Sequence, residues 1–169
     1  MLELGKSGSH GLERGTVPVL SDGAVVATLR AANWKEAATA QVGATSWVFR
    51  RHGGRELIGR WAVDPDEAVR LRARQDSYWK GSWTVDLDGR TVDVVTASMW
   101  KGTHRYLSGG RQVAESGSTG GWSPRPTLTA DDGLPLHQQV FLLWVEMVIS
   151  RRNSAAAAGG ASAAVIGGT

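Results

Sequence analysis

Three arginines separated by single apolar residues could bind phosphate. Arg70, Arg72 and Arg74 lie in such an alternating segment. On a β-strand, side chains two residues apart share a face and lie about 6.8 Å from each other. A guanidinium group binds a phosphate through a fork of two hydrogen bonds. The spacing therefore predicts a groove for anionic head groups. Arg50, Arg51, Arg55 and Arg60 in the two preceding segments could lie beside it, and of these Arg50 and Arg60 are taken as candidate site residues.

The same arginines have a second interpretation, which needs no ligand. Asp64, Asp66, Glu67 and Asp76 flank the segment and could balance its charge. The arginines would then form an ordinary solvated outer face of a sheet. A basic face of this kind could also bind nucleic acid, for which we expect a steep dependence of affinity on salt.

Aromatic and basic residues are paired at a regular interval. Trp79-Lys80-Gly81 recurs 21 residues later as Trp100-Lys101-Gly102, and Trp122 follows 22 residues after Trp100. Tryptophan and basic side chains together are typical of a membrane–water boundary. The pattern predicts a membrane-binding rim made by Trp79, Lys80, Trp100, Lys101 and Trp122. In the alternative interpretation, which we favour for most of these rings, the tryptophans plug one end of the fold.

The elements that must position these residues are mostly short β-strands. Period-2 alternation predicts about eleven strands, near 16–20, 24–30, 36–42, 46–50, 57–63, 69–74, 83–87, 92–95, 104–107, 111–115 and 127–130. Tight-turn signals separate several of them, at 52–54, Asp88-Gly89 and Gly109-Gly110. Helix-start signals at 33–36 and 64–67 compete with this pattern, and we favour strands at both places. In an antiparallel meander, the 21-residue interval puts the tryptophans at one end and the tight hairpins at the other.

Residues 135–152 are predicted to form a helix that is apolar around nearly its whole circumference. Such a helix must be buried on all sides, and at about 27 Å it is short for a bilayer. About eleven or twelve strands can enclose it, so we predict an antiparallel up-and-down β-barrel around a C-terminal hydrophobic α-helix. Glu146 lies midway along this helix. It either pairs with an arginine, faces a gap in the wall, or forms a cation or proton site.

The predicted organisation is one domain between two loose ends. Residues 1–15 are assigned to a flexible N-terminus, 16–153 to the barrel domain, and 154–169 to a disordered Ala/Gly tail. The sequence has no cysteine and a net charge of +3, which excludes disulfides and Cys-bound metals and makes anionic partners plausible. The four histidines are far apart in the sequence, and neither a metal site, a cofactor nor a catalytic motif is expected.

The order of several motifs resembles the tubby C-terminal-like superfamily, which includes the LURP-one-related proteins and the phospholipid scramblases. The resemblance rests on Trp79-x3-Trp83, Leu87-Asp88-Gly89-Arg90, Trp100…Tyr106, Gly110-Arg111-Gln112-Val113-Ala114 and Leu134-Pro135-Leu136, and it covers roughly residues 16–152. It implies a twelve-stranded barrel around a central hydrophobic helix and, as in tubby proteins, phosphoinositide binding at a membrane. The cysteines and the calcium-binding segment of scramblases are missing.

These observations favour a non-enzymatic module that binds anionic membrane lipid or another phosphorylated ligand. We expect a cytoplasmic protein without a transmembrane segment, whose partner would be the inner membrane surface. Nucleic-acid binding through the same basic face is the first alternative. A structural or partner-docking domain is the second.

Overall fold

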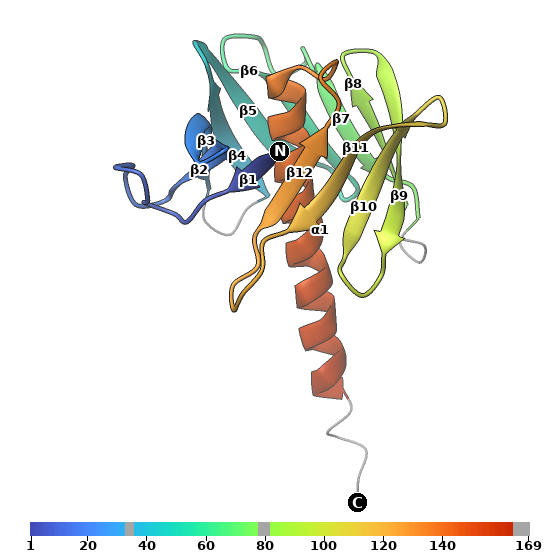
Figure 1. Cartoon of the computed structure of the whole chain (residues 1–169). Helices are drawn as coiled ribbons and strands as arrows, with labels where there is room; N and C mark the ends of the chain where they lie inside the picture. The colour runs from blue at the N-terminus through green and yellow to red at the C-terminus, as the bar shows by residue number, and fades with distance from the viewer. Residues whose placement is uncertain (33–35, 78–81, 164–169) are drawn as a thin grey trace, which may run out of the picture.

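The chain folds into a closed barrel of twelve antiparallel strands around one C-terminal helix (Figure 1). The computed structural model describes residues 1–32, 36–77 and 82–163. Each strand pairs with its neighbours in sequence, and the first strand pairs with the last. The strands are β1 Leu2–Leu4, β2 Thr16–Ser21, β3 Ala24–Ala31, β4 Ala37–Val42, β5 Thr45–His52, β6 Glu56–Trp61, β7 Leu71–Gln75, β8 Trp83–Leu87, β9 Arg90–Ser98, β10 Thr103–Ser108, β11 Arg111–Ser118 and β12 Pro126–Ala130.

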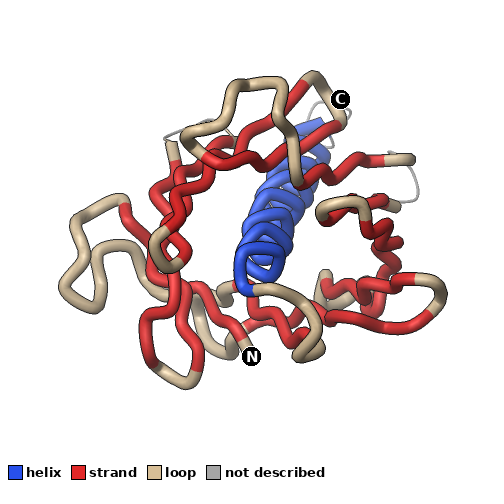
Figure 2. The backbone as a smooth tube through the Cα atoms, turned by 90° about the horizontal axis from the view of Figure 1, so that it is seen from above, coloured by secondary structure: helices blue, strands red, loops and turns tan. Residues whose placement is uncertain are grey.

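The helix α1, Leu136–Ala163, runs through the ring of strands and leaves it at the other end (Figures 1 and 2). Residues 140–145 have at most a trace of exposed surface, with Trp144 and Phe141 among the largest fully buried side chains. The prediction of a barrel around an apolar helix is therefore confirmed. Over residues 140–149 the wall hides nearly every face of the helix from water, which is what its apolar circumference there requires.

Consecutive antiparallel strands place the loops alternately at two ends of the barrel. We call one the helix-start end: it carries the loops after the even-numbered strands, including 131–135. The helix-exit end carries the loops after the odd-numbered strands, and α1 leaves the barrel there. Tight turns at the helix-start end contain residues with positive φ, such as Asp88 at 52° and Gly89 at 89°. Both values suit the two-residue hairpin that the Asp-Gly pair predicts.

One large side chain in the wall meets the helix because its neighbours are small. On β5, Phe49 lies between Ala38 of β4 and Gly59 of β6. Its ring is 5.2 Å from that of Phe141 and 5.4 Å from that of Trp144. A Cβ atom on Gly59 would lie 3.1 Å from the Phe49 ring. The small residues on each side therefore leave Phe49 the space to pack against α1.

The first turn of the helix is fixed to the wall by a histidine. The ring of His137 stacks on Trp47, with centroids 4.8 Å apart and planes 9° apart. Its Nε2 lies 3.2 Å from a carboxylate oxygen of Asp88, which also accepts a hydrogen bond from Gln138. The Asp88-Gly89 hairpin thus sets the position at which α1 enters the barrel.

The N-terminus differs from the prediction. Residues 1–15 were expected to be flexible, but Leu2–Leu4 form β1, which closes the barrel between β2 and β12. Leu2 and Leu4 are buried. Three residues are too few to show an alternating pattern above chance. The segment is ordered by its pairing with strands from elsewhere in the chain, because without β1 both β2 and β12 would have an unpaired edge.

The end of the helix also differs from the prediction. We expected α1 to stop at 152 and 154–169 to be disordered, whereas the helix continues to Ala163. Residues 154–158 are exposed, so no buried face holds them. Alanine has the highest intrinsic helix propensity, and adding turns to an existing helix avoids the cost of nucleation. Residues 164–169 lie outside the described residues.

Two predicted strand positions need comment. The segment 62–70 is a loop of turns, and β7 begins only at Leu71, so the predicted strand at 69–74 starts two residues late. At the other place, Ala37–Val42 form β4 as predicted, whereas residues 33–35 lie outside the described residues.

Candidate functional site

The predicted arginine groove is divided by the structure. Arg72 and Arg74 lie on the outer face of β7, and Arg70 lies just before it. Each has an acidic partner within the ion-pair distance: Asp64 for Arg70 at 3.1 Å, Glu56 for Arg72 at 2.7 Å, and Asp76 for Arg74 at 3.4 Å. The guanidinium of Arg70 also lies 3.7 Å from the Trp61 ring centroid.

Arg60 and Arg50 do not join these side chains in one groove. Arg60 contacts Asp66 at 2.5 Å and donates hydrogen bonds to backbone oxygens of Trp61 and Asp64 at the helix-start end. Arg50 lies near the end of β5, at the helix-exit end, and has no ion pair with a described residue. The acids expected to balance the arginine face, Asp64, Asp66 and Asp76, pair with Arg70, Arg60 and Arg74, whereas Arg72 pairs with Glu56, which was not among them.

The tryptophans predicted for the rim are fully exposed wherever they are described. Trp100 and Trp122 have relative exposures of 101% and 106%. They lie in the β9–β10 and β11–β12 loops, both at the helix-exit end, and Lys101 is exposed beside Trp100. Their rings do not plug the barrel, so our preferred interpretation is wrong for these two. Trp79 and Lys80 lie outside the described residues.

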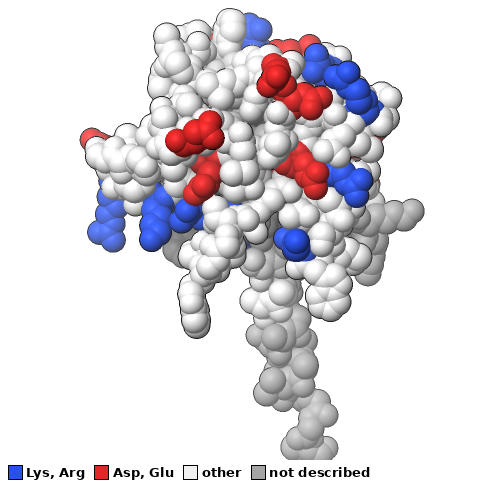
Figure 3. All heavy atoms as spheres, in the orientation of Figure 1, with Lys and Arg blue, Asp and Glu red and all other residues white. Residues whose placement is uncertain are grey.

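Charge is unevenly distributed between the two ends. The described acidic residues at the helix-start end are Asp22, Asp64, Asp66, Glu67, Asp86, Asp88, Asp93, Asp131 and Asp132, against Arg60, Arg70, Arg72, Arg90 and Arg111. The described basic residues at the helix-exit end are Lys6, Arg14, Arg30, Arg50, Arg51, Arg55, Arg74, Lys101, Arg125, Arg151 and Arg152, against Glu3, Glu13, Glu36, Glu56 and Asp76. On the face in Figure 3, acidic side chains lie over the upper part, and Lys and Arg lie along the lower left rim and also at the upper right.

Pairing increases this asymmetry. Among the described residues, most basic side chains without an ion pair lie at the helix-exit end: Lys6, Arg14, Arg50, Arg51, Arg55, Lys101 and Arg151. Arg105, also without an ion pair to a described residue, lies midway along β10. At the helix-start end, Arg90 is the one described basic residue without an ion pair. The unpaired positive charge therefore faces one direction, the direction in which α1 leaves the barrel.

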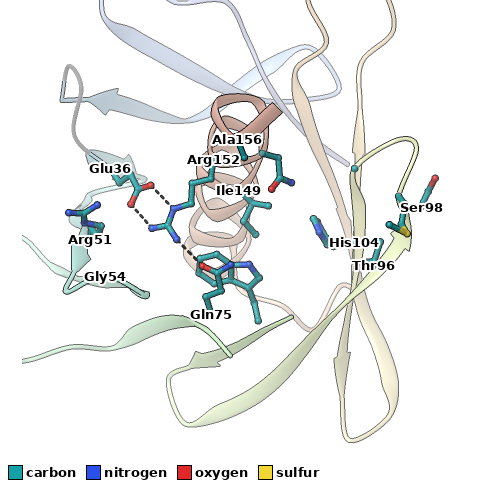
Figure 4. A pocket seen from close by; sticks show the side chains of 14 residues that line it. Glu36, Arg51, Gly54, Gln75, Thr96, Ser98, His104, Ile149, Arg152 and Ala156 are labelled. Carbon is teal, nitrogen blue, oxygen red and sulfur yellow. Dashed lines mark hydrogen bonds and ion pairs between the residues drawn. The ribbon is translucent and has the colours of Figure 1, made fainter. Parts of the chain in front are cut away.

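A cavity of about 570 Å³ opens at the helix-exit end between α1 and the wall (Figure 4). We call it the exit cavity. Its lining combines polar and apolar side chains: Glu36, Arg51, Gly54, Gln75, Trp83, Thr96, Ser98, Met99, Gly102, His104, Ile149, Arg152, Asn153 and Ala156. In Figure 4, Arg51 and Glu36 lie on one side of the helix, and His104, Thr96 and Ser98 lie on the other.

Arg152 and Glu36 form the central ion pair of the exit cavity. Arg152 donates from Nε and Nη2 to the two carboxylate oxygens of Glu36, each at 2.5 Å, and from Nη1 to Gln75 at 3.4 Å. The hydrogen bond from Arg152 lowers the pKa of the Glu36 carboxyl, and the charges of Arg152 and Arg51 add to this. The Arg152 guanidinium also lies 5.3 Å from the Trp83 ring. Glu36 and Gln75 thus hold all three of its nitrogens.

Deeper in the barrel, Glu146 is buried with two polar partners from β10. The Nδ1 atom of His104 lies 3.1 Å from each carboxylate oxygen of Glu146, and Tyr106 donates a hydrogen bond to Oε1. Burial is the main cause that raises the pKa of the Tyr106 hydroxyl well above its usual value, and the Glu146 charge adds to it. The predicted arginine partner is wrong, since a histidine and a tyrosine fill that role.

Several residues of the exit cavity were not singled out by their sequence pattern. Arg152 was taken only as part of a helix end, and Glu36 as part of a capping signal. Arg51 was named only as a neighbour of the arginine groove. It shares a strand face with Trp47 and Phe49, and this alternation could have placed it on the inner side of the wall. Glu36, Gln75 and His104 come from distant segments, and only the closed barrel brings them together.

A comparison of the chain with protein-family models, curated proteins and solved structures found no match. Within the described residues, no helix has the length and hydropathy needed to cross a membrane.

Proposed function

We propose that the protein is a non-enzymatic module that binds anionic membrane lipid through its helix-exit end. One observation carries the proposal: fully exposed Trp100 and Trp122 lie at the same end as most of the unpaired basic side chains. Exposed indole rings favour the membrane–water boundary. Each basic side chain near an anionic leaflet contributes about 1 kcal/mol.

The position of the loops adds support. Trp100 and Trp122 lie in two neighbouring hairpins, β9–β10 and β11–β12, on the same barrel end. Met99 precedes Trp100 and is also exposed, at 89%. Because α1 continues past these loops to Ala163 (Figure 1), a membrane that contacts these side chains and the basic residues near the rim must also receive the end of the helix. The opposite end has more acidic than basic side chains and would be repelled by an anionic leaflet.

The superfamily resemblance is a second support for this function. It implies twelve strands around a hydrophobic helix, and this chain has that architecture. Phosphoinositide binding and kinship with the tubby C-terminal-like proteins are parts of the proposal that follow from the resemblance alone.

Co-sedimentation with vesicles tests the proposal. We expect binding to vesicles of phosphatidylserine in phosphatidylcholine, and at least about tenfold weaker binding to phosphatidylcholine alone. The double variant Trp100→Ala/Trp122→Ala should lose most of the binding, as should Arg55→Glu/Lys101→Glu. Two matched controls lie at the helix-start end: exposed Val63→Ala for the apolar change, and unpaired Arg90→Glu for the charge change.

Nucleic-acid binding is the outcome that would replace this proposal. Single-stranded DNA or RNA would stack on exposed aromatic rings and bind with a steep salt dependence. A gel shift with an oligonucleotide at low salt, together with no vesicle binding, would overturn the lipid proposal in favour of nucleic acid.

A further inference from the structure

We infer that the exit cavity binds a single amphiphile whose oxyanion head group contacts Arg51 and whose apolar part lies between α1 and the barrel wall. This inference deepens the proposed function and rests on it in one respect, because the cavity opens at the end that would face the membrane. A cavity of about 570 Å³ is within the size range of small-molecule sites.

The available positive charge in the cavity belongs to Arg51. The nitrogens of Arg152 are already engaged by Glu36 and Gln75. The lowered pKa of Glu36 keeps that carboxylate ionised and paired. By contrast, the Arg51 guanidinium has no hydrogen-bond or ion-pair partner within the described part of the chain, although it lines the cavity. Its five N–H donors suit a phosphate or carboxylate group.

His104 supplies a second polar group on the other side of the helix. Its Nδ1 contacts the Glu146 carboxylate, and its Nε2 makes no hydrogen bond to a described residue. The hydroxyl groups of Thr96 and Ser98 line the same side. These groups can hydrogen-bond ester or hydroxyl oxygens next to an anionic head group.

The apolar lining requires more than a free anion. Trp83, Met99, Ile149 and Ala156 line the cavity together with the charged groups. Ile149 and Trp83 are almost fully buried already, with exposures of 5% and 3%, so the apolar lining still open to water belongs to Met99 and Ala156. An inorganic phosphate would leave this surface in contact with water, whereas a short hydrocarbon chain would cover it. The combination therefore selects an amphiphile.

Isothermal titration calorimetry with soluble ligands tests the inference. We expect dihexanoyl phosphatidic acid and decanoate, both below their micelle concentrations, to bind with one ligand per chain. Dihexanoyl phosphatidylcholine has the same chains but no net charge, and glycerol 3-phosphate has the head group without the chains. Each should bind at least about tenfold more weakly. The relative affinities of phosphatidic acid and decanoate then distinguish a phosphate from a carboxylate head group.

Two variants locate the ligand in the cavity. Arg51→Gln should weaken binding of dihexanoyl phosphatidic acid at least about tenfold, because it removes the charged donor. Ala156→Trp should abolish binding by filling the cavity from an exposed helix position, where the fold tolerates a large side chain. The matched controls are Arg90→Gln, at the other end of the barrel, and Ala157→Trp, which is exposed but does not line the cavity.

The outcomes separate this inference from the proposed function. It is overturned if neither anionic amphiphile binds, if glycerol 3-phosphate binds as tightly as phosphatidic acid, or if Ala156→Trp binds like the wild type. Vesicle binding without binding of soluble amphiphiles supports the membrane function and removes the cavity ligand. Binding of soluble amphiphiles without vesicle binding supports the cavity and removes the membrane function.

Discussion

Glu146 shows how one polar residue is accommodated inside an apolar helix. Its side chain is 5% exposed, and burying an unpaired carboxylate would be costly. His104 and Tyr106 lie two residues apart on β10, so both point inward and reach the same carboxylate. These contacts tie the middle of α1 to one strand and fix the rotation of the helix in the barrel.

Replacing Glu146 by leucine tests this arrangement. We expect Glu146→Leu to reduce the free energy of unfolding by about 3 kcal/mol, because it leaves His104 and Tyr106 buried without their acceptor. Glu146→Gln keeps one acceptor oxygen and should lose less. Urea unfolding of both variants measures the difference. Equal stability of Glu146→Leu and the wild type would show that the contacts of Glu146 with His104 and Tyr106 contribute nothing to the free energy of unfolding.

The raised pKa of Tyr106 predicts that the protein loses stability in alkaline solution. The Tyr106 pKa is raised in the folded state, so the folded protein keeps the phenol proton when the unfolded chain, with a tyrosine pKa of about 10, begins to lose it. Its contribution is complete below about pH 10 and declines above it by about 1.4 kcal/mol per pH unit, up to the folded pKa. Tyr106→Phe should lack this component. Urea unfolding between about pH 9 and 11 measures it, and parallel curves for the two proteins would contradict the assignment.

At the scale of elements, the fit of α1 in the barrel depends on small residues in the wall. Gly59 lies opposite Phe49 on one side and Leu71 on the other. A Cβ atom there would lie 3.1 Å from Phe49 and 3.2 Å from the Leu71 Cβ. The absence of a side chain on β6 at this point therefore allows β5 to contact the helix through its aromatic ring.

Gly59→Ala should destabilise the protein by about 1–3 kcal/mol, since overpacking displaces the Phe49 ring or its neighbours. The control is Gly54→Ala, where a new Cβ atom would have no neighbour within 4 Å. Thermal unfolding followed by circular dichroism compares the two. A Gly59→Ala protein as stable as the control would mean that the barrel wall accommodates the added methyl group without loss of stability.

The short strand β1 gives a second prediction for this scale. Leu4→Ala should cost about 2–5 kcal/mol, because Leu4 is 3% exposed and its truncation leaves a cavity in the core. In a flexible N-terminus, the same change would have no effect. Leu12 is half-buried in the mostly exposed loop that follows β1, and Leu12→Ala serves as the control, which should cost at most about 1 kcal/mol. Urea unfolding decides between an ordered and a flexible terminus.

The whole molecule has two ends of opposite character. Antiparallel connectivity assigns the loops with Trp100 and Trp122 to the helix-exit end, and the Asp88-Gly89 and Gly109-Gly110 hairpins to the other. The ends also differ in charge, as the distribution of ion pairs shows. Such a molecule would meet an anionic surface with its helix-exit end first.

Salt should therefore weaken vesicle binding without abolishing it. Raising the salt concentration from about 50 mM to about 500 mM screens the charges of the rim, while the transfer of the tryptophans into the interface persists. We expect a residual affinity that depends on Trp100 and Trp122, measured by co-sedimentation of the wild type and the double alanine variant at both concentrations. A wild-type affinity that is independent of salt would contradict the role of the basic rim.

The sequence by itself determined the strands, the tight hairpins and the buried helix, because each follows from local periodicity and turn chemistry. It also predicted that Trp100 and Trp122 share one end, since the 21-residue interval matches two strands and two turns. Only the tertiary structure decided the exposure of those tryptophans, the order of β1 and the partners of Glu146. It likewise divided the arginines between the ends and joined Arg51, Glu36 and Arg152 around a cavity. These features depend on contacts between segments far apart in the chain, about which a local pattern carries no information.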